Sequence, residues 1–199
     1  MPEKKGHIRG IACGIFKKEI ESLVQKGLID QSFKYLDSML HMSPAKLEIQ
    51  IEKHITHLKD KKILIVYGDC QPSMTSMNKR PNICRVSGMN CCEIILGKKE
   101  YKRLRSQGAF FLLPEWTLRW EEVFKKQLGF NQENARSFMR ELHTKLIYLD
   151  TGVSPVPEKA LMAASTFCNL PFEIMSVDLS HLLKVVLDAI ERLNHIDDK

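Results

Sequence analysis

The sequence predicts an α/β fold, in which a mostly parallel sheet is flanked by helices in a Rossmann-like arrangement. Short apolar runs alternate with amphipathic segments along the chain, which is the pattern of a sheet covered by helices. Right-handed crossovers between successive strands make such a sheet mostly parallel. With 199 residues and no internal repeat or obvious linker, the chain fits one α/β domain over residues 1–199. We expect about five or six strands in its sheet.

Six apolar runs are short enough to form these strands. The run Ile63-Leu64-Ile65-Val66-Tyr67 is continuously apolar and mostly β-branched, as strands covered on both faces are, so it should be central in the sheet. In chain order, the predicted strands are residues 8–13, 63–67, 83–86, 110–113, 146–149 and 172–177.

Helices are predicted between these runs, where apolar residues recur at helical spacing. Ser43 and Pro44 start one of them with a capping hydroxyl and a proline at the first helical position. Gly27 and Gly129 follow the ends of two others, where glycine is the usual C-cap. In chain order, the predicted helices cover about residues 17–26, 43–58, 91–106, 117–128, 131–142, 157–168 and 182–193.

Composition excludes several classes of protein. No apolar run approaches the roughly 18 residues that span a bilayer, so no membrane partner is expected. Residues 1–7 lack the apolar stretch of a secretory signal, and a cytoplasmic location follows. Two short patches, residues 1–9 and 97–105, account for the formal net charge of +6, which is unlike the broad basic face of a nucleic-acid-binding protein.

The common nucleotide-binding and hydrolase motifs are missing. The sequence has no P-loop, no G-x-G-x-x-G, no G-x-S-x-G and no H-E-x-x-H. Whether the protein is an enzyme is therefore left open, and the cysteines become the most informative feature.

Three of the six cysteines follow predicted strands at the edge of the sheet where ligands bind. Cys13 ends the first strand, Cys70 comes just after the central strand, and Cys91 starts the helix after the third strand. A disulfide framework is not expected in a reducing compartment, and no pair has C-x-x-C spacing. A metal site would have to be assembled from these distant positions by the fold.

The residue types suit a zinc site. A helix N-terminus should lower the pKa of the Cys91 thiol and favour the thiolate that metals and electrophiles need. His41, just ahead of a helix start, could reach the same edge. Cys13, Cys70, Cys91 and His41 would complete a tetrahedral zinc site, whereas three ligands and an open position would suit catalysis. Iron is also compatible with this ligand set.

Structural roles remain open for the same residues. Free cysteine often acts as a small buried hydrophobe, and Cys84 and Cys168 are expected in the core. Glu115 and Asp150 follow strands and are candidate acids, bases or hydrogen-bond partners of a metal ligand, but helix capping or loop bracing would explain them equally well. The basic run 97–105 could hold an anion or an acidic partner, or be a solvated helix face.

Several short segments spread over nearly the whole chain form a recognisable series. These segments are Ile11-Ala12-Cys13-Gly14, Leu40-His41-Met42-Ser43-Pro44, Val66-Tyr67-Gly68-Asp69-Cys70, Cys91-Cys92-Glu93-Ile94-Ile95-Leu96-Gly97, Phe111-Leu112-Leu113-Pro114-Glu115-Trp116 and Leu146-Ile147-Tyr148-Leu149-Asp150-Thr151-Gly152. In these segments and their order, the chain resembles the domain-of-unknown-function family numbered 1638, found in methanogenic archaea and anaerobic bacteria.

The resemblance implies relatives encoded beside corrinoid-dependent methyltransferases of methylamine and one-carbon metabolism. It makes a corrinoid protein or a methyltransferase the expected partner, with a corrinoid reaching the protein through it. The chain departs from the family pattern at Gln71, where a glycine is common, and at Met89-Asn90, where relatives often carry His-Asp. A ligand or proton carrier supplied by that histidine would be missing from this chain.

Three functional hypotheses follow. The leading one is a metal-thiolate protein, with zinc as the expected metal, acting in anaerobic one-carbon or corrinoid metabolism. The second is a module that binds a small ligand and has no chemistry of its own, using the Cys91 helix N-terminus and the basic run to hold an anion. The third is a thiol-redox enzyme with Cys91 as nucleophile and Cys70 as resolving thiol.

Overall fold

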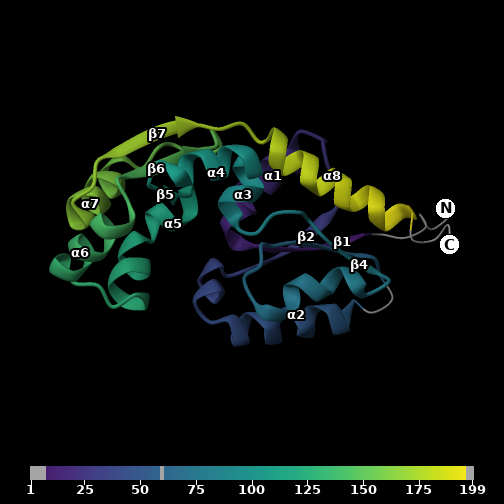
Figure 1. The fold of residues 1–199 in the computed structure, drawn as a ribbon. Helices are drawn as coiled ribbons and strands as arrows, with labels where there is room; N and C mark the ends of the chain where they lie inside the picture. Colours follow the sequence, from purple (N-terminus) through teal and green to yellow (C-terminus); the bar gives the residue numbers. More distant parts are fainter. Residues whose placement is uncertain (1–7, 59–60, 196–199) are drawn as a thin grey trace. The chain divides into compact units, whose positions relative to one another are not determined.

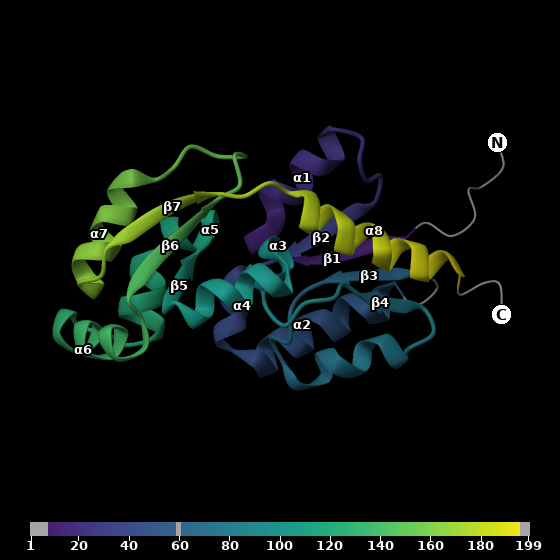
Figure 2. The same ribbon diagram turned by 45° about the horizontal axis from the view of Figure 1, so that its top comes forward.

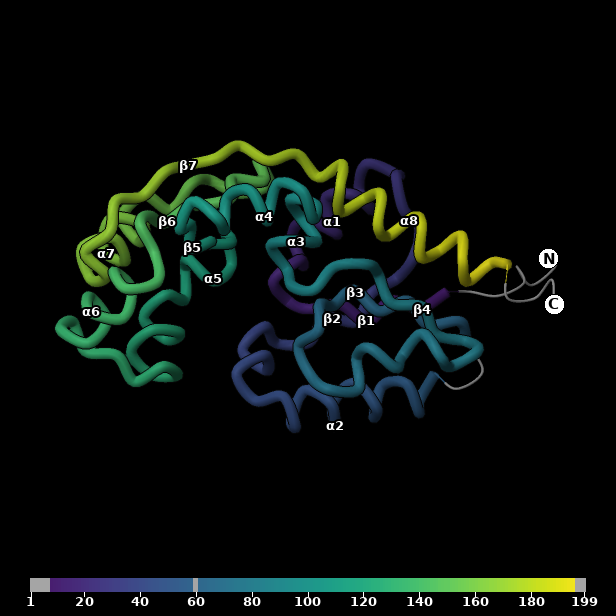
Figure 3. Tube along the Cα trace, in the orientation of Figure 1, coloured from purple at the N-terminus to yellow at the C-terminus, as the bar shows by residue number. Residues whose placement is uncertain are grey.

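The computed structural model describes residues 8–58 and 61–195. The chain divides into two compact units, of which one comprises Met1–Ile94 with Ser180–Lys199 and the other Ile95–Leu179. Figure 3 traces how the chain leaves the first unit after the start of α3 and returns to it through α8 (Ser180–Asn194). The second unit is therefore an insertion in the first.

A four-stranded parallel sheet forms the centre of the first unit, in the order β2-β1-β3-β4. Its strands are β1 (Arg9–Cys13), β2 (Ser32–Leu36), β3 (Ile63–Val66) and β4 (Ile83–Arg85). The register places Ile11 of β1 between Lys34 and Ile65 of its two neighbours. Every residue of β3 is buried, so the prediction that 63–67 supplies a central strand is confirmed.

Helices cover both faces of this sheet. Figure 2 shows α2 (Pro44–His57) on one face, with α1 (Lys17–Gln25) and α8 on the other. Helix α2 begins at the predicted proline and buries Leu47, Ile51 and Ile55. The six-residue α3 (Cys91–Leu96) and three short helical turns, η1 (Gly14–Phe16), η2 (Ser38–Met42) and η3 (Pro72–Lys79), complete the connections.

The strand order of the first sheet reverses between β1 and β3. The chain moves from β1 outward to β2, then crosses back to β3 and continues to β4 on the other side. Figure 1 labels β1, β2 and β4, and Figure 2 also labels β3, so the crossover can be followed there. In open parallel sheets such a reversal leaves a crevice at the carboxyl ends of the two strands, and ligands bind there.

The second unit holds a three-stranded parallel sheet in the order β5-β6-β7. Its strands are β5 (Ala109–Leu112), β6 (Lys145–Asp150) and β7 (Phe172–Ser176). Its helices are α4 (Lys98–Ser106), α5 (Pro114–Leu118), α6 (Gln132–Leu142) and α7 (Glu158–Cys168), with a π-helical segment η4 (Glu122–Gln127).

The predicted α/β class and its parallel strands are confirmed, but the described residues contain seven strands in two sheets instead of one sheet of five or six. The additional strand, β2, has mixed and largely exposed residues, as an edge strand does, and so lacks an apolar run. The predicted helix 91–106 is two helices, because Gly97 adopts a φ of 80° between them. The predicted helix 117–128 is replaced by α5 and η4.

Two further expectations concern targeting. No helix within 8–58 and 61–195 is both long and apolar enough to cross a membrane. Residues 1–7, on which the absence of a secretory signal was argued, lie outside the described residues.

Candidate functional site: a thiol cluster around Tyr67

The fold places the three predicted cysteines on neighbouring segments of the first unit. Cys13 is the last residue of β1 and is 5% exposed. Cys70 lies three residues after Tyr67, which directly follows β3, and Cys91 is the first residue of α3. These positions are the carboxyl ends of β1 and β3, where the strand order reverses, and the helix that follows β4.

Tyr67 is coupled electrostatically to the thiols of Cys13, Cys70 and Cys91, and we call these four residues the thiol cluster. Its side chain is 2% exposed, and its hydroxyl has no nitrogen or oxygen partner among the described residues. Burial raises the pKa of Tyr67, and a hydrogen bond with Cys13 raises it too, as does the negative charge that Cys13, Cys70 and Cys91 carry once they are ionised. The ionisation of the Tyr67 phenol is therefore coupled to all three thiols, and its hydroxyl remains protonated beside them.

The thiols are also electrostatically coupled to one another. Burial raises the pKa of Cys91 well above its ordinary value, and the charges of Cys13, Cys92 and Cys70 raise it further. Burial likewise raises the pKa of Cys70, opposed by a backbone hydrogen bond with Gly68 and by the charge of Arg85. The expectation of a lowered Cys91 pKa is therefore wrong, because desolvation and neighbouring thiols outweigh the start of a six-residue helix.

Close backbone packing brings the Cys70 loop against the Cys91 loop. A Cβ atom on Gly68 would lie 2.5 Å from the Met89 carbonyl oxygen and 2.6 Å from the Cα of Asn90. The Asp69 N–H donates to that same Met89 oxygen over 2.7 Å. Only glycine allows this approach, and Gly68 comes directly after Tyr67.

Arg85, the last residue of β4, ties these two loops together. Its Nη1 donates to the backbone oxygens of Tyr67 (3.0 Å) and Gly88 (3.2 Å), and its Nη2 pairs with Asp69 Oδ1 at 2.8 Å. The Arg85 side chain is only 11% exposed, so these charge-assisted bonds are shielded from water. We call this arrangement the Arg85 clamp.

Asn90 caps the N-terminus of α3. Its Oδ1 accepts a hydrogen bond from the Glu93 N–H at 2.9 Å, as a helix-capping side chain does. The same residue packs on Gly68, so the cap that fixes Cys91 and the loop that carries Cys70 share a residue. Glu93 itself is only 7% exposed.

His41 lies in η2, after the end of β2. The Cys13 end of β1 runs close to this segment, since a Cβ on Gly14 would lie 2.8 Å from the Leu36 carbonyl oxygen. The residue is exposed, yet burial of its ring lowers its pKa. His41 is not among the groups that shift the pKa of Cys70 or Cys91 in either direction.

The four predicted ligands are not arranged as a preformed metal site. Within the part of the chain that the structure describes, no three His, Cys, Asp or Glu side chains are grouped as metal ligands. The thiols of Cys13, Cys70 and Cys91 are coupled electrostatically through Tyr67, but as they stand in this structure they do not form a group that could hold an ion. The metal site thus stays a prediction.

The remaining cysteines agree with structural roles. Cys84 in β4 and Cys168 in α7 are buried, as predicted for core residues. Burial raises the pKa of Cys168 to about 11. Cys92 is half-buried beside Cys91 and contributes its charge to the Cys91 environment.

Glu115 and Asp150 belong to the second unit and have structural partners there. Glu115 sits in the first turn of α5 and pairs with Arg119 at 3.1 Å. Asp150 ends β6, where its Oδ1 accepts the Gly152 N–H at 3.0 Å and its carbonyl oxygen accepts the Val177 N–H at 2.8 Å. The observed contacts match the helix-stabilising and loop-bracing alternatives.

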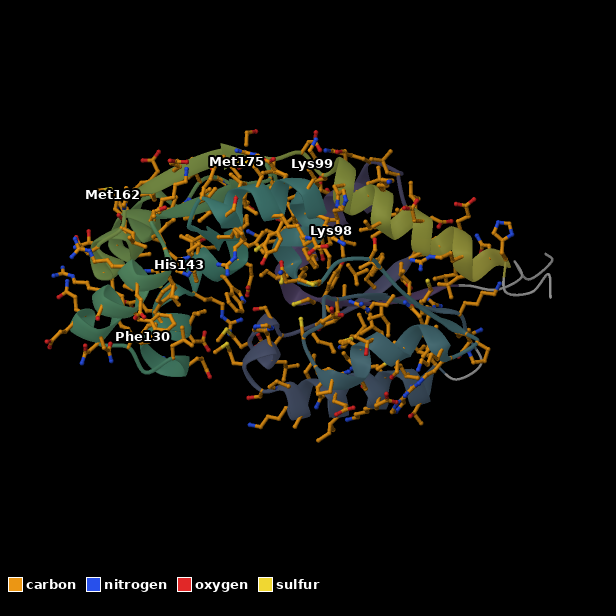
Figure 4. The ribbon with its side chains drawn as sticks, viewed as in Figure 1. Lys98, Lys99, Phe130, His143, Met162 and Met175 are labelled. Atoms are coloured by element: carbon orange, nitrogen blue, oxygen red, sulfur yellow. The ribbon has the colours of Figure 1, made fainter. Side chains whose placement is uncertain are left out.

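The basic run belongs to α4 of the second unit. Figure 4 labels Lys98 and Lys99 on this helix, and both are exposed. Arg103 is paired with Glu100 through two hydrogen bonds of 2.9 and 2.6 Å. The break at Gly97 places this run on a different helix from Cys91.

Tyr67 and Arg85 were not among the predicted site residues. Tyr67 was assigned to a strand by its apolar character, and only the fold shows that its hydroxyl reaches the thiols. Arg85 gave no signal, because a single arginine in a short strand is usually solvated at its tip.

A family model described as "Protein of unknown function (DUF1638)" matches residues 35–186. The chain belongs to this family. The matched range includes His41, Tyr67, Cys70 and Cys91, whereas Cys13 precedes it. Searches of curated proteins and of solved structures each found no match.

Proposed function

We propose that the protein binds a thiophilic metal ion, zinc in the first place, through Cys13, Cys70 and Cys91, and acts in anaerobic one-carbon or corrinoid metabolism. The observation that supports the metal site is the gathering of three thiols around the buried Tyr67 at the strand-order reversal. Thiolate sulfur is the ligand that zinc and iron accept most readily in such sites.

The residues around the thiols suit a bound cation with three thiolates. Three thiolates on a divalent ion leave a net negative charge, which the Arg85 guanidinium at the Cys70 loop would partly balance. The protonated Tyr67 hydroxyl can donate a hydrogen bond to the Cys13 sulfur. A bound zinc ion would supply Lewis-acid chemistry and activate a thiol or water at an open fourth position. His41 from η2 is the proposed fourth protein ligand where that position is closed.

The link to corrinoid metabolism rests on the family resemblance alone. A metal-activated thiol is a suitable acceptor for a methyl group, and this chemistry would make a corrinoid protein or a methyltransferase the partner. Neither partner is identified by the geometry of the first unit.

The test is metal analysis of protein purified without chelator, followed by Co(II) substitution. We expect bound zinc or iron, and Co(II) absorption bands typical of thiolate ligands that weaken in Cys13→Ser, Cys70→Ser and Cys91→Ser. Cys84→Ser is the control, because Cys84 is buried like Cys13 but lies in β4 and is not among the groups that shift the pKa of Tyr67 or Cys91. Metal-free protein without Co(II)–thiolate bands would overturn the proposal.

The metal affinity should increase with pH. Cys70 and Cys91 have raised pKa values, so both are protonated at neutral pH and must release protons when a metal binds. We expect tighter Co(II) binding as pH rises through the alkaline range, and proton release in weakly buffered solution. Binding that is independent of pH would show that other groups hold the ion.

Different observations bear on the two alternative functions, a thiol-redox enzyme and an anion-binding module. The thiol-redox hypothesis needs an activated Cys91 thiolate, and the raised Cys91 pKa gives no such activation. The anion-binding hypothesis retains the exposed lysines of α4 as its support. Thermal-shift screening with phosphates, corrinoids and thiol cofactors separates it from the metal proposal, since stabilisation by an anion that persists in Cys70→Ser would favour it.

A further inference from the structure

The second unit contains a surface pocket of about 540 Å³ that is unrelated to the thiol cluster. Aromatic and apolar side chains from two segments, Trp120 ahead of η4 and Phe167 and Met162 of α7, line it together with Lys125 and Glu121. Met162, labelled in Figure 4, is 60% exposed. An exposed methionine beside two aromatic rings is an apolar surface that a ligand can cover.

A cation already sits on the aromatic rings of this pocket. The Lys125 Nζ lies 4.9 Å from the Trp120 ring centroid and 5.6 Å from that of Phe167. The two rings are 5.4 Å apart and inclined at 56°. Glu121 Oε1 adds a carboxylate 2.5 Å from the same Nζ. Two ring faces and a carboxylate around a positive charge are the elements that recognise organic cations.

The π-helical segment explains how Lys125 reaches this place. In a π-helix the repeating bond joins residue i to i+5, so each turn is wider than in an α-helix. Lys125 is five residues after Trp120 and four after Glu121 in the sequence, and the wide turn over Glu122–Gln127 sets its ammonium above the Trp120 ring. Such turns occur frequently at functional sites.

Lys125 is held loosely enough to be displaced. Its side chain is 43% exposed and that of Glu121 is 61% exposed, so their ion pair is screened by water and salt. By contrast, Trp120 is only 8% exposed and fixed by its packing against Phe167. A ligand cation would therefore meet a buried, packed ring and compete with a solvent-exposed lysine.

We propose that this pocket binds a small organic cation of the quaternary-ammonium class, and that Lys125 occupies the cation position when the ligand is absent. A primary ammonium would gain little over Lys125 itself. A quaternary ammonium is weakly hydrated, and its methyl groups can contact the rings and Met162, which Lys125 leaves exposed.

The test uses choline and tetramethylammonium as probes on the full chain, with sodium chloride at equal ionic strength as the salt control. The chain has two tryptophans, so the indole N–H signals of Trp120 and Trp116 can be followed separately by NMR. We expect the Trp120 signal to titrate with choline, and the neutral carbon analogue of choline, with a tert-butyl group in place of trimethylammonium, to bind roughly tenfold more weakly.

The decisive variant is Lys125→Ala, because removing the competing cation should strengthen choline binding by roughly three- to tenfold. Lys126→Ala is the matched control, since the adjacent lysine is exposed in the same segment and does not line the pocket. Glu121→Gln and Phe167→Leu should both weaken binding. Unchanged or weaker binding in Lys125→Ala, equal binding of the neutral analogue, or no response of Trp120 would each overturn the proposal.

Discussion

Gly68 determines how closely the Cys70 loop can approach the Cys91 loop. Any side chain there would enter the space of the Met89 and Asn90 backbone, which cannot move as a flexible side chain can. Tyr67, immediately before it, then presents its buried hydroxyl to the three thiols. The absence of a side chain at Gly68 thus allows the loop that carries Cys70 to lie against the Met89 and Asn90 backbone.

We expect Gly68→Ala to destabilise the protein by about 1–3 kcal/mol, because overpacking against backbone forces a local shift. Urea denaturation should report the loss. Gly27→Asn is the control: Gly27 has a φ of 69°, a Cβ added there would meet no atom within 4 Å, and asparagine tolerates that conformation. A Gly68→Ala protein as stable as wild type would mean that the two loops separate at no cost.

His143 should make the stability depend on pH. Burial lowers its pKa below the ordinary value of 6.5, aided by the charge of Arg105 and opposed by backbone hydrogen bonds with Gly108 and Ala109. The unfolded chain therefore takes up a proton near pH 6.5 while the folded protein resists it, so this contribution is present above that pH and is lost as pH falls below it.

The measurement is the melting temperature of wild type and His143→Phe between mildly alkaline and mildly acidic pH. Phenylalanine keeps a ring against Phe110, whose centroid is 5.1 Å from that of His143, but cannot titrate. We expect a smaller acid-induced decrease in the variant, though not its disappearance, since His41 and His54 also have lowered pKa values. An identical decrease in both proteins would contradict this assignment.

At the scale of elements, the Arg85 clamp joins the loop after β3 to the loop after β4. Its three partners, Tyr67, Gly88 and Asp69, lie on both sides of the gap between these loops. Strand β4 carries no proposed ligand, but the side chain of Arg85, its last residue, connects the loops on which Cys70 and Cys91 lie. Loss of the clamp should let Cys70 move away from Cys91.

We expect Arg85→Ala to slow the reaction of phenylarsine oxide with the Cys70 and Cys91 thiols roughly tenfold. This corresponds to an increase of about 1.4 kcal/mol in the activation free energy. A Cys92→Ser background removes the sequence-adjacent thiol. Arg80→Ala is the matched control, because Arg80 also makes two charged hydrogen bonds, to Glu52, but at a 41%-exposed position away from the thiols. Equal slowing in both variants would attribute the effect to general destabilisation.

In the whole molecule, the second unit is inserted into the first, and the two segments of the first unit that flank the insertion contact each other. The ring Nδ1 of His181, in α8, lies 3.0 Å from the Ile94 carbonyl oxygen in α3. The two ends of the first unit are therefore adjacent, and α8 packs on β3 and β4 after the chain returns. Adjacent ends are typical of a domain insertion, because a domain inserted between them requires little change in the fold of the domain that receives it.

We expect a chain in which a short Gly-Ser linker replaces residues 97–179 to fold cooperatively and to keep the thiol cluster. Circular dichroism, a urea transition and arsenical capture would verify this, with Cys70→Ser in the shortened chain as the control for capture. A shortened chain without a cooperative transition would instead support the prediction that residues 1–199 form one domain.

Local sequence patterns were enough to predict the α/β class, the buried central strand, the start of α2 at Pro44 and the three cysteines at strand ends or at a helix start. These features follow from local rules, because apolar runs, helix-starting residues and strand ends are recognised from adjacent residues. Three other features became apparent only from the folded chain: the strands form two sheets, Tyr67 and Arg85 lie beside the cysteine-bearing loops, and the pKa of Cys91 is raised. Pairing between distant segments, close approach at Gly68 and desolvation depend on neighbours that are far apart in the chain, and no local pattern encodes them.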